Sequence, residues 1–258
     1  MKREYAFVFD ADDTLWMNEW QYSSAYATYF QYLYEVLRNE MPALNLVWER
    51  YFKKEQELYR EYGVRRGRVS EAMVATYKDL CLWIRVRFGK EAYKSEHEKR
   101  IREIGDMPFQ FELLQWAPGA CEVLQKLKNE GHALYLLSSY DKEVFPKKAE
   151  FLQVYRFFPE DNIWITEFKK TKEDFITVTG WNEERDKSVS TWYAVGNSTS
   201  DLSPALEISE RWHGVHIPHC STSQYFQGKQ NIDYWTLDSF VHPRSVTIRS
   251  ISELLSVV

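Results

Sequence analysis

Residues 5–9 form a short run of apolar and aromatic side chains that leads directly into Asp10-Ala-Asp12-Asp13-Thr14. The run is too short for a helix and rich in β-forming residues, so it predicts a buried strand. In an open parallel sheet, ligands bind at the carboxyl ends of the strands, where these carboxylates would lie. Asp10 and Asp12 are two residues apart and would face the same side if strand geometry continues through them. Carboxylates held close together favour a bound cation or a raised pKa.

The stretch 16–115 has apolar residues at intervals of three and four, which is typical of amphipathic helices. One predicted helix covers residues 19–39, and the next carries Trp48, Tyr51 and Leu58 and ends at Gly63. The last, at 90–104, is highly charged, and we expect it to be solvated on most sides. The stretch therefore predicts an all-helical insert that packs on itself.

From residue 116 onward, short apolar runs alternate with helical patterns. Such alternation predicts a parallel sheet with helices on both faces, and thus an α/β fold. We expect one core domain formed by residues 1–15 and 116–258, interrupted by a helical domain at 16–115. The predicted strands after the first are 133–137, 163–165, 191–195, 215–217 and 234–237, and a last helix is predicted at 251–255.

Composition excludes several classes of protein. The net charge of −5 argues against a general nucleic-acid binder, and no stretch is long enough to span a membrane. The cysteines Cys81, Cys121 and Cys220 are far apart and odd in number, which favours free thiols in a reducing cytoplasm. We expect a cytoplasmic protein, a monomer or homodimer, without a nucleic-acid or membrane partner.

The polar residues at the predicted strand ends supply what phosphoryl transfer needs. Asp10 can act as a nucleophile, and Asp12 as general acid and then general base. Ser138 offers a donor to a phosphoryl oxygen, and Lys169 offers a positive charge. Asp201, at the start of a helix, can help to hold Mg²⁺.

These residues fall into four segments whose order and spacing resemble the haloacid dehalogenase (HAD) superfamily of hydrolases. The first is Asp10-Ala-Asp12-Asp13-Thr14, and the second is the apolar strand ending in Ser138. The third is a lysine shortly before a helix, matched best by Lys169. The fourth is Gly196-Asn197-Ser198-Thr199-Ser200-Asp201. The long helical insert resembles the C1-type cap of that superfamily.

The resemblance implies a Rossmann-like, three-layer core with a helical cap inserted after the first strand. It also implies Mg²⁺-dependent hydrolysis of a small phosphorylated metabolite through an aspartyl-phosphate. Asp10 and Asp201 would bind the metal by their side chains and Asp12 by its backbone carbonyl, while Thr14 would support the loop. Asn197 departs from the Asp of many such phosphatases; its amide oxygen can still bind the metal, although with less charge.

Several alternatives remain open. A phosphosugar mutase shares this core, and a catalytically silent binding protein would be consistent with Asn197. A 2-haloacid dehalogenase is a further alternative, but that branch usually lacks the second aspartate, so Asp12 favours a phosphatase. Ser139 competes with Ser138 for the phosphate, and Lys170 and Lys172 compete with Lys169.

Two other clusters have less specific interpretations. Arg65, Arg66 and Arg68 could contact an anionic substrate, although solvated loop arginines are commoner. The run formed by His213, His216, His219 and Cys220 contains zinc-ligating residue types. In a strand His213 and His216 would point to opposite faces, so we do not expect a zinc site.

Overall fold

The structure is a computed structural model that describes residues 4–182, 189–218 and 240–258, and these fall into two compact units. Among the described residues, the helical unit consists of Glu19–Phe111, and the α/β unit contains the rest. The insert predicted at 16–115 is slightly longer than the helical unit at both ends. The strand predicted at 234–237, together with His219 and Cys220, lies outside the described residues.

The α/β unit is built on a sheet of six parallel strands in the order β3-β2-β1-β4-β5-β6. This is the strand order of the doubly wound Rossmann fold. From β1 the chain adds strands toward one edge of the sheet as far as β3, and it then returns to add β4, β5 and β6 toward the other edge. The strands are β1 (Glu4–Phe9), β2 (Ala133–Ser139), β3 (Ile163–Thr166), β4 (Val189–Gly196), β5 (Trp212–His216) and β6 (Ser245–Thr247).

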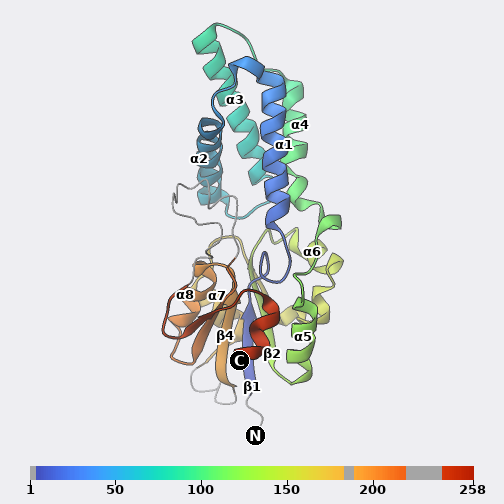
Figure 1. The fold of residues 1–258 in the computed structure, drawn as a ribbon, viewed down its shortest axis with the longest axis vertical. Coiled ribbons are helices and arrows are strands. Elements are labelled where there is room, and N and C mark those ends of the chain that lie inside the picture. The colour runs from blue at the N-terminus through green and yellow to red at the C-terminus, as the bar shows by residue number, and fades with distance from the viewer. Residues whose placement is uncertain (1–3, 183–188, 219–239) are drawn as a thin grey trace. The chain divides into compact units, whose positions relative to one another are not determined.

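Helices cover both faces of this sheet, as predicted (Figure 1). On β1, Ala6 and Val8 pack in a cluster with Phe175 of α7 and Leu202 of α8. The alternate residue Phe9 faces the other side and contacts Phe158. Because both faces are buried, the strand is apolar or aromatic from Tyr5 to Phe9 instead of alternating with polar residues. The helices of this unit are α5 (Ala120–Asn129), α6 (Phe145–Phe151), α7 (Lys172–Thr179) and α8 (Thr199–Leu206).

The described residues of both units also contain short 3₁₀ helices, at Arg38–Glu40, Met107–Phe109, Phe111–Leu113, Val154–Arg156, Glu160–Asn162 and Ile251–Ser256. The last of these is the segment predicted as a C-terminal helix, and it packs against α5.

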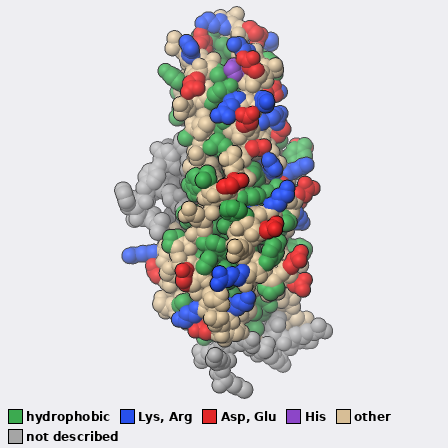
Figure 2. All heavy atoms as spheres, turned by 90° about the vertical axis from the view of Figure 1, so that its right-hand side faces the viewer, with side chains coloured by type: hydrophobic (Ala, Val, Ile, Leu, Met, Phe, Trp, Pro, Cys, Tyr) green, Lys and Arg blue, Asp and Glu red, His purple; other side chains and the backbone are tan. Residues whose placement is uncertain are grey.

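The helical unit has a hydrophobic core of its own. Its helices are α1 (Glu19–Leu37), α2 (Leu44–Tyr62), α3 (Arg68–Phe88) and α4 (Ser95–Gly105). In α4 only Ile101, Ile104 and Gly105 are buried, so most of this helix is solvated, as predicted. Figure 2 shows acidic and basic side chains interspersed over the face on which α4 lies. No helix among the described residues combines the length and apolar character needed to cross a membrane.

Close packing of α4 on α3 generates a testable prediction. A methyl group at Gly105 would lie 2.8 Å from the backbone nitrogen of Ser70, closer than van der Waals contact allows. Alanine improves helix propensity by about 1 kcal/mol, but overpacking against backbone costs about 1–3 kcal/mol. We therefore expect Gly105→Ala to lower the free energy of unfolding in urea. The exposed Glu103→Ala should change it by less than about 0.5 kcal/mol, and equal values for the two variants would contradict this packing.

Candidate active site

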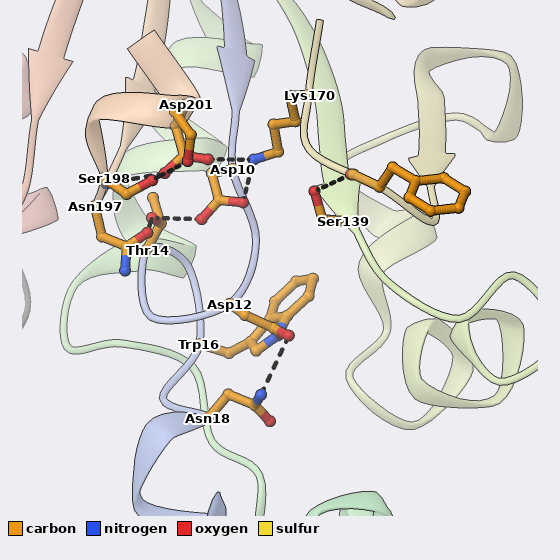
Figure 3. A network of polar contacts seen from close by, with 12 residues as sticks. Asp10, Asp12, Thr14, Trp16, Asn18, Ser139, Lys170, Asn197, Ser198 and Asp201 are labelled. Atoms are coloured by element: carbon orange, nitrogen blue, oxygen red, sulfur yellow. Dashed lines mark hydrogen bonds and ion pairs between the residues drawn. The ribbon is translucent and has the colours of Figure 1, made fainter. Parts of the chain in front are cut away.

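The loop after β1 separates Asp10 from Asp12. The strand ends at Phe9, and the amides of Thr14, Leu15 and Trp16 turn back to the carbonyl of Ala11. Asp13 has a φ of 60°, which reverses the chain direction. The side chains of Asp10 and Asp12 consequently point in different directions (Figure 3). Strand geometry does not continue through them, so the condition for a shared face is not met.

Asp10 lies at the centre of a buried ionic cluster between the ends of β1 and β4. Its Oδ1 is 2.5 Å from Nζ of Lys170, and its Oδ2 accepts a hydrogen bond from Thr14 Oγ1 at 2.9 Å. Lys170 Nζ also donates to Oδ1 of Asp201 at 2.6 Å. All four side chains are buried, so two carboxylates share one ammonium group away from water.

This shared burial changes the acidity of the cluster. Burial and the nearby Asp201 raise the pKa of Asp10 from 3.8 to about 7, although Lys170 acts in the opposite direction. Burial alone would lower the pKa of Lys170, but Asp10 and Asp201 raise it above its ordinary value. The lysine therefore stays charged, and a further positive charge beside Asp10 would favour its ionised form.

Asp201 is positioned by the turn between β4 and α8. Its Oδ2 accepts hydrogen bonds from the amide of Ser198 at 2.9 Å and from its hydroxyl at 2.6 Å, which completes a capping box. Gly196 leaves room for this arrangement, since a Cβ there would lie 2.9 Å from Cγ of Asp201. Asp201 thus caps α8 and also faces Asp10 through Lys170.

Asn197 is held in the cluster by a residue that sequence reasoning had considered only as a zinc ligand. His216, buried at the end of β5, contacts the carbonyl of Asn197 through Nε2 at 3.1 Å. Its Nδ1 accepts from the amide of Phe240, also at 3.1 Å. Nε2 therefore carries the proton, and His216 fixes the backbone that presents Asn197.

The position of the Asn197 amide shows whether the residues beside Asp10 and Asp201 fit a cation. One end of that amide lies 3.2 Å from Oδ2 of Asp10 and from Oδ2 of Asp201. Octahedral Mg²⁺ has oxygen ligands at about 2.0–2.1 Å, which places neighbouring oxygens about 2.9 Å apart. With its oxygen turned inward the amide would complete such a set, and with its nitrogen turned inward it would hydrogen-bond to both carboxylates. The residues therefore fit a hard cation on the Oδ2 side, opposite Lys170.

Carboxylates are few at this position. Within residues 4–182, 189–218 and 240–258, no group of three or more His, Cys, Asp and Glu side chains could hold a metal ion. A cation at the cluster would depend on Asp10, Asp201 and neutral oxygens.

Asp12 is held by a separate set of donors. Its Oδ1 accepts from the indole of Trp16 and from Lys148 Nζ, the latter at 2.5 Å. Its Oδ2 accepts from Asn18 Nδ2 at 3.2 Å. The Asp12 side chain remains 23% exposed, whereas Lys148 is 1% exposed. Asp12 is thus anchored on its inner side and accessible to solvent.

Lys148 was not among the predicted site residues, although its position carries a signal. In α6 the buried residues Phe145, Lys148, Ala149 and the following Leu152 recur at helical spacing, so a lysine occupies the apolar face. A lysine is rarely buried without an acidic partner. Burial lowers the pKa of Lys148, and Asp12 offsets this only in part.

The other predicted phosphate-binding residues are two serines of β2 and a lysine in the loop before α7. Ser138 is buried at the end of β2, next to β1. Ser139 donates to the carbonyl of Phe168 at 3.0 Å and thereby ties down the loop before α7. Lys169 is exposed, and the structure places Lys170 at Asp10 instead.

The arginine turn of the helical unit is occupied by internal contacts. Arg68 pairs with Glu55, and Arg66 lies 3.7 Å from Asp106. Arg65 is placed over the ring of Tyr62. These contacts support the structural interpretation of the three arginines.

Comparison with known proteins shows which family the chain resembles. The haloacid dehalogenase-like hydrolase family matches residues 6–177. A haloacid dehalogenase-like family hydrolase from Xanthomonas campestris has 18% identity and a TM-score of 0.68, over 98% of this chain and 90% of its own. No curated protein matches by sequence.

Two further solved structures have the same fold. A HAD-hydrolase named YfnB from Bacillus subtilis, bound to magnesium, has 20% identity and a TM-score of 0.55, over 99% of both chains. A 2-haloacid dehalogenase from Pseudomonas syringae has 17% identity and a TM-score of 0.55, over 98% of this chain and 96% of its own.

The assignment of the buried lysine can be tested through stability. Lys170→Met leaves Asp10 and Asp201 buried without a cation, and breaking a buried ion pair costs about 3–5 kcal/mol. We expect a loss of that size in the free energy of unfolding, measured in urea at pH 8. Lys169→Met is the matched control and should stay within about 0.5 kcal/mol of the wild type. A larger loss for Lys169→Met than for Lys170→Met would reverse the assignment.

Proposed function

Because the chain belongs to the haloacid dehalogenase-like hydrolases, we propose that it is a Mg²⁺-dependent phosphatase acting on a small phosphorylated metabolite. The observation that carries this proposal is the anchored carboxylate of Asp12, two residues after the proposed nucleophile Asp10. An alkoxide leaving group needs a proton, which Asp12 can supply. A halide leaves without one, so a dehalogenase would not need Asp12 as a general acid.

The residues of the chain can be assigned to the steps of such a reaction. An oxygen of Asp10 attacks phosphorus and forms an aspartyl-phosphate, while the bond to the ester oxygen breaks and that oxygen takes a proton from Asp12. Asp12 then accepts a proton from the water that attacks phosphorus, which releases inorganic phosphate and restores Asp10. Lys170 and Ser138 would neutralise and orient the phosphoryl oxygens.

Asp10, Asp201 and Asn197 would hold Mg²⁺ by their side chains, and Asp12 by its backbone carbonyl. The metal would supply positive charge to the phosphoryl oxygens and favour the ionised form of Asp10. Two observations support this part of the proposal: one end of the Asn197 amide lies 3.2 Å from Oδ2 of Asp10 and from Oδ2 of Asp201, and one structural relative is bound to magnesium. The free thiols Cys81 and Cys121 are consistent with a cytoplasmic setting, which we propose as well.

The nucleophile is tested with a panel of small phosphate monoesters and Mg²⁺. We expect inorganic phosphate to be released by the wild type, and Asp10→Asn to lower the rate about 10³-fold or more, since loss of a nucleophile removes the covalent route. Asp13→Asn is the matched control, because it removes a charge next to the site while asparagine tolerates the positive φ.

Other outcomes of the same panel would replace the proposal. Isomerised sugar phosphate without released phosphate would indicate a mutase. Chloride released from 2-chloropropionate without metal, with no turnover of any ester, would indicate a dehalogenase.

The raised pKa of Asp10 predicts that metal binding depends on pH. Since the pKa is raised from 3.8 to about 7, the protonated form of Asp10 stabilises the folded state of the metal-free protein. This contribution to the free energy of unfolding is fully present below pH 3.8 and is lost as pH rises through 7. Mg²⁺ needs the ionised form, so its apparent affinity should be about tenfold weaker at pH 6 than at pH 8. Thermal unfolding with and without MgCl₂ should therefore show a larger stabilisation at pH 8. An equal shift at both pH values would contradict the role of Asp10, and Asp10→Asn is the control that should lose the pH dependence.

A further inference from the structure

Lys148 is a buried charged side chain to which the proposed reaction assigns no role. It comes from α6, far along the chain from the loop after β1, yet its Nζ lies 2.5 Å from Oδ1 of Asp12. The same nitrogen lies 4.1 Å from the ring centroid of Tyr140 and 5.4 Å from that of Trp16. Two aromatic faces and one carboxylate oxygen therefore hold the ammonium group in a single place.

The donors around Asp12 are distributed unequally between its two oxygens. Oδ1 accepts both the Trp16 indole and Lys148, whereas Asn18, at the longer distance of 3.2 Å, is the only donor to Oδ2 within the part of the chain that the structure describes. An oxygen that already accepts two strong donors cannot also carry a proton toward a third group. Oδ2 is thus the oxygen that remains for proton transfer.

We propose that Lys148 is a positioning residue that fixes Oδ1 of Asp12 and leaves Oδ2 as the oxygen that exchanges the proton with the leaving group and with water. This inference rests on the proposed phosphatase function. The ammonium group itself neither gains nor loses a proton in the reaction: the proton passes from Oδ2 to the ester oxygen as the phosphorus–oxygen bond breaks, and from water to Oδ2 in the second step. Without Lys148, the Asp12 carboxylate can rotate between several arrangements.

The test compares two substrates that differ in their need for a proton. An alkyl phosphate releases an alkoxide that must be protonated, whereas 4-nitrophenyl phosphate releases a stabilised phenolate that need not be. General acid catalysis contributes roughly 10²–10⁴-fold where it is used. We expect Lys148→Met to lower kcat/KM for the alkyl phosphate at least tenfold more than for 4-nitrophenyl phosphate. The exposed neighbour Lys147→Met should leave the ratio of the two values unchanged.

This ratio separates positioning from folding, because both substrates are measured on the same sample and any loss of folded protein cancels. Lys148→Gln, which keeps a polar end in the pocket, is a second variant with the same expected direction. Equal losses on both substrates, or no loss on either, would overturn the proposal.

If the wild type hydrolyses neither substrate, the proposed function fails, and a double-mutant cycle then decides the role of Lys148 by itself. Asp12→Asn, Lys148→Met and the double variant are compared by urea unfolding. Non-additive changes would support the pairing of Lys148 with Asp12, and additive changes would overturn it.

Discussion

Two carboxylates and one ammonium group are buried together where β1 and β4 end, so one negative charge is left uncompensated whenever both carboxylates are ionised. Such a charge is costly unless hydrogen bonds or a cation offset it. The surrounding residues provide the hydrogen bonds: Thr14 donates to Asp10, and the amide and hydroxyl of Ser198 donate to Asp201. The negative charge that remains makes this end of the sheet suited to a cation.

The fold could be predicted where burial leaves a pattern in the sequence. A strand covered on both faces must be apolar throughout, so β1 and β2 stand out, and the helical unit shows the spacing that its separate core requires. Strand β6 could not be found in this way, because Ser245–Thr247 is short and no residue in it is fully buried. The order of the strands depends on packing between distant segments, which no local pattern records.

The site was predictable to the extent that a strand end fixes the position of a residue. Asp10 comes immediately after β1, and Ser138 lies near the end of β2. Asp201 has a fixed place in the capping box at the start of α8. The lysine is different: the choice between Lys169 and Lys170 depends on which of the two side chains the irregular loop before α7 turns toward Asp10. Lys148 reaches Asp12 only through the tertiary packing of α6.

The two connections to the helical unit are paired with each other inside the α/β unit. Trp16 and Trp116 form an antiparallel bridge, and the amide of Ala117 donates to the carbonyl of Leu15. The two places where the chain leaves and re-enters the α/β unit therefore lie side by side. The hydrophobic core of the helical unit, for its part, contains no residues from the sheet. In evolutionary terms the insert is a separable module, whose sequence can change, or which can be exchanged for another, while the charge arrangement around Asp10 is preserved.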